Sequence, residues 1–216
     1  MIEACIFDLD GVITDTAEYH FLGWKKMADE AGLQFDRNIN EQLRGVSRRQ
    51  SLNIILKYNN KELSEEKIHE LMKKKNDYYK QSLEAITEKD FLPGIKELIL
   101  KLREKGIKTA IASASKNADK VINNLNANAL FDFIADGYSV KNTKPAPDLF
   151  LFAAEHLQVD PSKSIVFEDA HAGIMAALNG GFLSVGIGPE ERVGQAHLRY
   201  DTTDEIQFEK VLSLNS

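Results

Sequence analysis

Short apolar runs rich in β-branched residues recur along this chain, and helical patterns separate most of them from one another. Runs of this length are typical of buried strands, while the intervening segments repeat their apolar residues with helical spacing. Strand–helix alternation of this kind predicts a parallel, doubly wound sheet with helices on both faces. The strand candidates are 2–7, 108–112, 133–135, 164–167 and 182–186, and the helix candidates are 94–105, 117–125, 148–156 and 172–179.

Glycine and proline mark several of these boundaries. Pro93 followed by Gly94 is typical of a helix start. Gly106 and the Gly180–Gly181 pair each follow a predicted helix, where glycine is the usual C-terminal cap. We therefore expect helices to end at these glycines and the chain to turn there into the next strand.

The segment that follows the first strand has a different character. Residues 16–83 contain little strand signal, and 16–31, 48–58 and 64–82 have the spacing of amphipathic helices. We therefore predict a doubly wound, Rossmann-like α/β core domain formed by 1–15 and 88–216, with an inserted helical cap domain at 16–87. Asp15 and Thr16 on one side, and 88–93 on the other, are the predicted hinges.

The composition narrows the class of protein. The chain has 216 residues and a formal net charge of -6, which argues against nucleic-acid binding and against attraction to anionic lipid. Its single cysteine, Cys5, excludes an internal disulfide and lies in an apolar run, as a small buried side chain would. No run is long enough to span a bilayer, and the first segment is too acidic for a signal peptide. We expect a cytoplasmic monomer with neither a nucleic-acid nor a membrane partner.

Two carboxylates end the first predicted strand. Asp8 and Asp10, followed by Gly11, stand where open α/β sheets bind their ligands. Such a pair can divide labour, one carboxylate acting as nucleophile and the other as general acid and base. An aspartate that attacks phosphorus needs a cation to offset charge repulsion, so we expect a metal nearby. The alternative is an ordinary Asp-Gly turn. A calcium loop is excluded because Gly11 is not at its sixth position and no Glu stands at the twelfth.

Three further polar signals follow later strands. Ser113 offers a hydroxyl at the end of one strand, where backbone N–H groups also suit a phosphate. Lys144, before Pro145, could screen the charge of a phosphoryl group. Glu168 and Asp169 close a buried strand, where adjacent acids are costly unless they bind a cation. Each signal alone has an ordinary structural explanation, but their convergence at one sheet edge is what magnesium-dependent phosphoryl transfer needs.

These signals, in this order, resemble the motifs of the haloacid dehalogenase superfamily. Asp8-Leu9-Asp10-Gly11-Val12 matches its first motif, Ser113 the second, Lys144 the third, and Glu168-Asp169 the fourth. The resemblance implies that Asp8 is the nucleophile and Asp10 the acid/base. It implies Mg²⁺ held by the Asp8 carboxylate, the Asp10 backbone carbonyl and the Asp169 carboxylate, with Glu168 close by. Ser113, the Ala114 backbone and Lys144 would hold the transferring phosphoryl group.

The cap segment adds a second resemblance, to the β-phosphoglucomutases within that superfamily. It is carried by the stretch from Asp15 to His20, by the loop beginning at Gly45, and by Lys75-Asn76-Asp77. The implied substrates are small sugar phosphates, and the implied reaction converts β-D-glucose 1-phosphate to D-glucose 6-phosphate through β-glucose 1,6-bisphosphate. The substrate-binding residues it implies are His20, Trp24, Gly45, Val46, Arg48, Ser51, Lys75, Ser115, Lys116 and Asn117.

Two other functions remain open at this stage. A sugar-phosphate phosphatase of the same fold would share every core motif and lack a dedicated grip on a second phosphate. A signalling receiver domain would be phosphorylated on aspartate without catalysing a reaction, although the helical insert would then have no purpose.

One site residue is also left open. Arg49 adjoins Arg48, and which guanidinium faces the substrate rests on the alignment.

Overall fold

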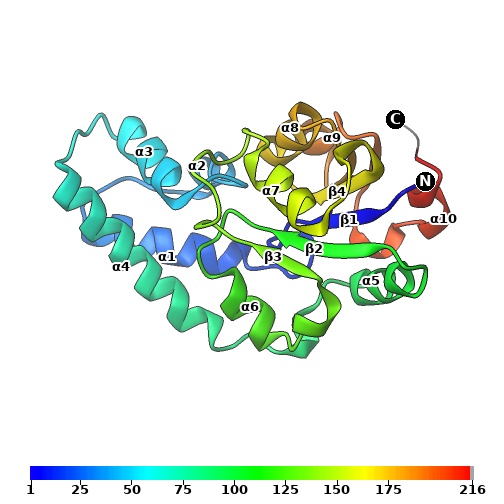
Figure 1. Ribbon diagram of the computed structural model, residues 1–216. Helices are drawn as coiled ribbons and strands as arrows, with labels where there is room; N and C mark the ends of the chain where they lie inside the picture. Colours follow the sequence, from blue (N-terminus) through cyan, green and yellow to red (C-terminus); the bar gives the residue numbers. More distant parts are fainter. Residues whose placement is uncertain (215–216) are drawn as a thin grey trace.

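The centre of the molecule is a parallel six-stranded sheet (Figure 1). The computed structural model describes residues 1–214. The strand order is β3-β2-β1-β4-β5-β6, so β1 lies in the middle and the order reverses direction beside it. This confirms the predicted doubly wound fold and places the ligand-binding crevice at the carboxyl ends of β1 and β4. The strands are β1 (Ala4–Phe7), β2 (Lys108–Ala112), β3 (Phe133–Ala135), β4 (Ser164–Glu168), β5 (Leu183–Ile187) and β6 (Leu198–Tyr200).

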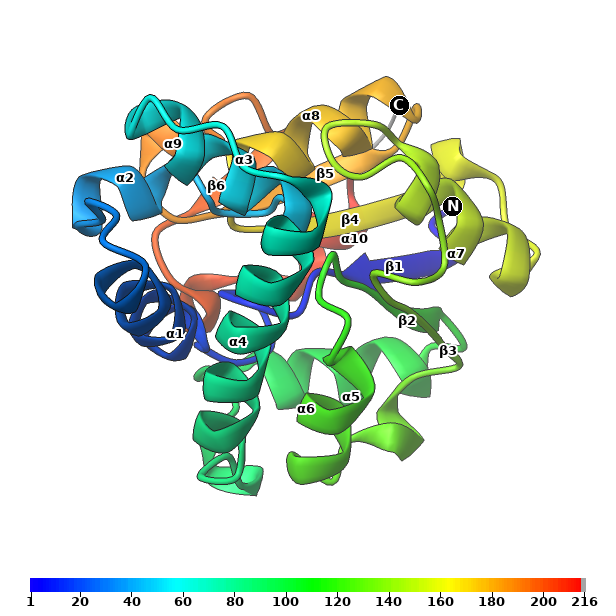
Figure 2. The same cartoon turned by 90° about the vertical axis from the view of Figure 1, so that its left-hand side faces the viewer.

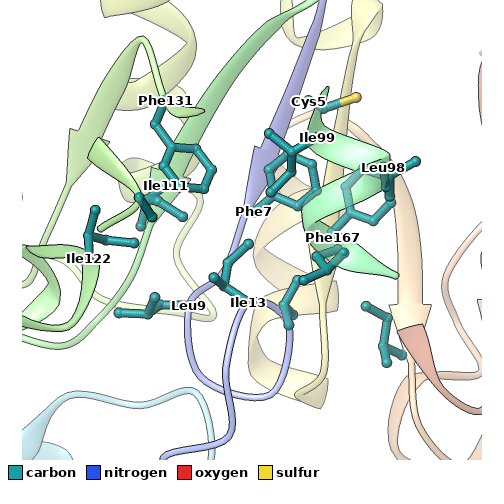
Figure 3. Close-up of a cluster of buried hydrophobic side chains, with 14 of the residues drawn as sticks. Cys5, Phe7, Leu9, Ile13, Leu98, Ile99, Ile111, Ile122, Phe131 and Phe167 are labelled. Atoms are coloured by element: carbon teal, nitrogen blue, oxygen red, sulfur yellow. The ribbon is translucent and has the colours of Figure 1, made fainter. Parts of the chain in front are cut away.

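Successive residues of β1 point to opposite faces of the sheet, and each face is covered by its own helices. Cys5 and Phe7 lie on one face, where the Phe7 ring stacks on Phe167 at 4.6 Å between centroids (Figure 3). Ala4 and Ile6 lie on the other face. The first face is covered by α5 (Ile95–Glu104), α6 (Ala118–Asn124) and α10 (Phe208–Leu212), the second by α7 (Asp148–Leu157) and α8 (His171–Asn179).

Most predicted elements match the structure to within a few residues. Gly106 and Gly181 adopt positive φ angles of 75° and 76°, as predicted for residues that follow a helix. The short strand β3 was predicted, but several other short elements gave no usable periodicity and were not. These are β6, α9 (Glu190–Val193), α10 and the 3₁₀ turns Glu88–Asp90, Asn128–Leu130, Pro161–Lys163 and Thr203–Glu205.

The inserted segment is helical, as predicted, and lies over the carboxyl ends of the strands (Figures 1 and 2). It has its own apolar cluster, which includes Trp24, Met27, Leu52 and Leu71. Because this cluster is separate from both clusters of the sheet, we propose that 16–87 is a cap domain and that 1–15 and 88–216 form the core domain. Its helices are α1 (Ala17–Glu30), α2 (Arg37–Glu41), α3 (Arg48–Tyr58) and α4 (Glu65–Leu83), of which α2 was not predicted.

The two connections between cap and core lie side by side. Thr14 and Phe91 form an antiparallel bridge, and the Thr14 hydroxyl donates to the Asp90 carbonyl at 2.6 Å. Asp15 and Thr16 come next, and the Asp15 carboxylate accepts the Ala17 N–H at 2.9 Å. This paired arrangement supports our proposal that the Asp15–Thr16 connection is a hinge. None of the helices described within 1–214 has the length and apolar character required to cross a membrane.

Candidate active site

A cavity of about 360 Å³ lies between the cap and the carboxyl ends of the strands. Residues of the helical insert and residues that follow the strands both contribute to its wall. Many of the residues predicted from sequence line it: Asp8, Asp10, His20, Trp24, Gly45, Val46, Arg48, Ser51, Lys75, Ser113, Ala114, Ser115, Lys116 and Asp169. Lys144, Glu168 and Asn117 are buried directly behind this wall.

Asp8 is held in place by hydrogen bonds to both of its carboxylate oxygens. Oδ2 accepts the Asp10 N–H at 3.0 Å, and Oδ1 accepts from the Lys144 ammonium. Lys144 is completely buried and also donates to the Glu168 carboxylate at 2.8 Å. Burial tends to lower the pKa of Lys144, but the Asp8 and Glu168 carboxylates outweigh it and raise the pKa. Lys144 is therefore a fixed positive charge beside the predicted nucleophile.

Asp10 has the properties of a proton donor at neutral pH. Burial, followed by the negative charge of Asp8, raises the pKa of Asp10 to about 7. The Thr16 hydroxyl donates to its Oδ1, and His20 Nε2 lies 3.7 Å from its Oδ2. General acids and bases work best when their pKa is near the operating pH. The surroundings of Asp10 thus suit an acid/base group, as the sequence predicts.

Asp8, Glu168 and Asp169 form a buried acidic cluster that fits a metal ion. One oxygen from each of the three lies within 4.8 Å of the others. Burial is the main cause that raises the pKa of Glu168 and of Asp169, and the neighbouring Asp8 charge adds to it. A divalent cation would offset the repulsion between the three carboxylates, and carboxylate oxygens are the ligands that Mg²⁺ prefers.

Two glycines make room for the acidic cluster. A Cβ on Gly173 of α8 would lie 1.9 Å from Glu168 Oε2, and one on Gly11 would lie 2.6 Å from Asp169 Oδ2. Gly11 also has a φ of 82°, which other residues rarely adopt. Only glycine allows the backbone to approach the carboxylates so closely at these positions.

A buried chain of side chains connects Asp10 to the cap. His20 Nδ1 lies 2.9 Å from Lys75 Nζ, and the Lys75 ammonium lies 4.4 Å from the centre of the Tyr79 ring. Trp24 lies on another side of the same ammonium, at 5.2 Å. Burial, followed by the charge of Arg48, lowers the pKa of Lys75 well below its usual value. Burial also lowers the pKa of His20. These contacts join the predicted acid/base residue to helices α1 and α4.

The two adjacent arginines of the cap differ in their surroundings. Arg49 donates two hydrogen bonds of 2.6 Å to Glu65 on the protein surface. Arg48 has no carboxylate within ion-pair distance in the described part of the chain, and burial lowers its pKa. A cation that faces a cavity without a carboxylate partner is suited to an anionic ligand. These contacts favour Arg48 over Arg49 as the residue that faces the substrate.

Polar groups after β2 line the opposite wall. Ser113 accepts the Ser115 N–H at 3.1 Å, and Ser115 in turn accepts the Asn117 N–H at 3.2 Å. Lys116 lies over the Tyr138 ring, 4.3 Å from its centre. Asn117 donates to Asn76 of α4 at 2.9 Å. Hydroxyls, N–H groups and an ammonium are thus brought together where a phosphate could bind.

Several cavity residues were not predicted from the sequence. Arg44 of the cap lines the cavity and donates to Asp169 Oδ2 at 3.3 Å. Arg192 of α9, outside the cavity lining, approaches the same oxygen at 4.0 Å. Arg44 precedes the predicted Gly45, but no periodicity indicates that its side chain reaches a residue 125 positions away. The others are Ala17, Asn40, Leu43, Ser47, Met72, Gly137, Val140, Lys141 and Thr143, and Arg49, the alternative to Arg48, also lines the cavity.

Comparison with known proteins identifies the family. Residues 2–181 match the family model described as haloacid dehalogenase-like hydrolase. The chain is 42% identical to a β-phosphoglucomutase of Bacillus subtilis over 96% of its length and 93% of that protein. A crystal structure of a β-phosphoglucomutase from Clostridium difficile superposes with a TM-score of 0.95 at 46% identity, covering 98% of this chain and 96% of that one.

More distant relatives include phosphatases. One is a phosphorylated carbohydrates phosphatase of Thermotoga maritima, 27% identical over 99% of this chain and 98% of that protein. The match to the β-phosphoglucomutases is closer and extends over cap and core alike. The chain is therefore an enzyme of the haloacid dehalogenase-like hydrolase family, and within that family it groups with the β-phosphoglucomutases.

Proposed function

We propose that this enzyme interconverts β-D-glucose 1-phosphate and D-glucose 6-phosphate through an aspartyl phosphate on Asp8 and a β-glucose 1,6-bisphosphate intermediate. The observation that carries the proposal is the distribution of charge around the cavity. One end holds Asp8, Lys144 and the acidic cluster, and Arg48 lines the cap wall without a carboxylate partner within 1–214. A phosphatase needs a single phosphate site, whereas a mutase must hold phosphates at both ends of one sugar.

The buried side chains suit the roles that the reaction requires. In the first step Asp10, as a carboxylate, takes the proton of the sugar 6-hydroxyl as that oxygen attacks the phosphorus on Asp8, and the bond from phosphorus to the Asp8 oxygen breaks to leave a free carboxylate. The bisphosphate then turns over in the cavity. In the second step Asp8 attacks the phosphorus at C1, the bond from phosphorus to the C1 oxygen breaks, and Asp10 returns the proton to that oxygen. A pKa of about 7 makes both forms of Asp10 available at neutral pH.

We propose Mg²⁺ as the metal, held by the carboxylates of Asp8 and Asp169 and the backbone carbonyl of Asp10, with Glu168 beside it. When bound, it would screen the negative charge of the transferring phosphoryl group. Lys144 would place a fixed positive charge beside the phosphoryl group. Ser113 and the Ala114 backbone, which follow β2 and line the cavity, would bind the same group. The closed cap excludes water, which would otherwise hydrolyse the phosphorylated Asp8.

A product assay tests the proposal directly. The purified protein is given β-glucose 1-phosphate, Mg²⁺ and a trace of the bisphosphate, and glucose 6-phosphate is followed against free phosphate. We expect glucose 6-phosphate to dominate, and we expect Asp8→Asn to form neither product because an amide cannot act as the nucleophile. If free phosphate dominates, the enzyme is a sugar-phosphate phosphatase instead.

A further inference from the structure

A single hydrogen bond joins the cap to the loop that carries Lys144. The Thr143 hydroxyl donates to Gln50 Oε1 at 2.6 Å, although the two residues are 93 positions apart. Thr143 belongs to the core and Gln50 to the first turn of the cap helix α3. This contact therefore exists only when the cap is closed over the cavity.

Gln50 is held rigidly on the cap side. Its Oε1 accepts the Ser47 N–H at 3.0 Å, while the Ser47 hydroxyl accepts the Gln50 N–H at 3.3 Å. Together these bonds form the capping box that begins α3. Since a backbone N–H can only donate, the oxygen of the amide, not its nitrogen, must face Ser47 and Thr143. Arg48, the predicted ligand of the distal phosphate, lies within the same helical turn, so Arg48 moves together with Gln50.

On the core side, Thr143 is the neighbour of a residue that contacts the predicted nucleophile. It immediately precedes Lys144, whose ammonium binds both Asp8 and Glu168. It also lines the cavity, so its hydroxyl lies at the point where cap and core close on the ligand. The hydrogen bond between Thr143 and Gln50 therefore links the turn that carries Arg48 to the loop that carries Lys144.

We propose that Thr143 and Gln50 form a closure latch, in which the Thr143 hydroxyl locks the Arg48 turn of the cap onto the Lys144 loop of the core. Both are positioning residues that act through Arg48 and Lys144. The latch strengthens the closed state in which phosphoryl transfer to a sugar competes best with hydrolysis. The inference rests on the proposed mutase function, because it concerns how the two phosphate sites are held in register.

The test measures how phosphorylated Asp8 divides its phosphoryl group between sugar and water. We expect Thr143→Val, which removes the hydroxyl with little change of shape, to lower the ratio of glucose 6-phosphate to free phosphate about 2- to 10-fold. That range corresponds to the loss of one neutral hydrogen bond. The matched control, Thr143→Ser, keeps the hydroxyl and should restore the ratio to within about 2-fold of wild type.

A double-mutant cycle separates a latch from a general disturbance of the loop. Gln50→Met removes the acceptor, and in that background Thr143→Val should have no further effect. If the effects of Gln50→Met and Thr143→Val instead multiply, or if Thr143→Val leaves the ratio unchanged, the latch does not exist.

Binding of glucose 6-phosphate provides a readout that does not depend on turnover. Trp24 is the single tryptophan of the chain and lines the cavity, so its fluorescence reports ligand binding. In the Asp8→Asn background, Thr143→Val should weaken the affinity for glucose 6-phosphate about 2- to 10-fold, and equal affinities would overturn the latch. If wild-type protein makes no glucose 6-phosphate, the mutase proposal fails. The dissociation constants for glucose 6-phosphate, with and without Thr143→Val, still test the latch.

Discussion

Lys144 and Lys75 are both buried lysines of the same site, yet their neighbours give them different properties. Lys144 contacts two carboxylates, which raise its pKa and keep it charged. Lys75 lies against aromatic rings and beside His20, and burial lowers its pKa. The first side chain is therefore suited to neutralising phosphate charge, and the second joins α4 to the acid/base residue through His20.

The raised pKa of Asp10 predicts a pH dependence for one half of the reaction. Transfer from the bisphosphate to Asp8 requires protonated Asp10, and the protonated fraction falls as the pH rises through about 7. The single-turnover rate should therefore fall about tenfold per pH unit above about 8. In Asp10→Asn the rate should be lower by about 10²-fold or more and independent of pH in this range. A wild-type rate that rises with pH would assign the proton transfer to another group.

Arg48 and Arg49 form a natural pair for testing the distal phosphate site. Removing a charged contact from a closed site costs about 2–5 kcal/mol, so Arg48→Ala should slow the mutase reaction by roughly 30- to 5000-fold. Acetyl phosphate has no second phosphate, so phosphorylation of Asp8 by this donor should fall far less.

Arg49→Ala is the matched control for Arg48→Ala. Arg49 also lines the cavity, but its guanidinium is already paired with Glu65, so we expect both reactions to continue at nearly the wild-type rate. If Arg48→Ala slows both reactions equally, Arg48 acts on folding or cap closure and the argument for two phosphate sites is lost.

At the scale of the elements, α8 carries a glycine whose position is set by the site and not by the helix. Alanine is normally favoured over glycine inside a helix by about 1 kcal/mol. At Gly173, however, a Cβ would lie 1.9 Å from Glu168 Oε2. We therefore expect Gly173→Ala to destabilise the protein by about 1–3 kcal/mol and to weaken metal binding.

Urea unfolding and calorimetric titration with Mg²⁺ measure the two effects of Gly173→Ala. His171→Ala, at an exposed position in the same helix, should change the free energy of unfolding by less than about 0.5 kcal/mol. A Gly173→Ala protein as stable as wild type would mean that Glu168 can move without loss, and that its contact with Lys144 is not needed for the fold.

At the scale of the whole molecule, the metal and the fold should stabilise each other. The acidic cluster draws its residues from β4 and from the end of β1, so a bound cation holds the centre of the sheet together. At a concentration 100-fold above its dissociation constant, Mg²⁺ should add about 2.7 kcal/mol to the free energy of unfolding. The midpoint of thermal unfolding should then rise by about 5–10 °C.

Asp169→Asn is the control for this stabilisation, because it removes one predicted ligand while the fold remains. We expect Mg²⁺ to raise its unfolding midpoint much less than that of wild type, and excess chelator to abolish activity in wild type. An equal rise in both proteins would show that the cation binds elsewhere.

The sequence alone was sufficient for the architecture and for the core of the site. Strand–helix alternation is a local property, since burial on both faces makes parallel strands apolar and amphipathic helices repeat with their own spacing. Parallel strands then bring their carboxyl ends together, which is why Asp8, Ser113, Lys144 and Asp169 could be expected at one edge. Elements as short as α2 and β6 have too few residues to show a period and were missed.

Only the tertiary structure decided how the cap meets the core. Arg48 and Arg49 are neighbours of identical type and both line the cavity, but packing pairs only Arg49 with a carboxylate, that of Glu65. The contacts of Arg44 with Asp169 and of Gln50 with Thr143 join residues 125 and 93 positions apart. Such contacts depend on how the proposed cap packs against the core. Local sequence patterns carry no signal for them, because they determine which face of a helix is apolar and not what lies opposite its polar face.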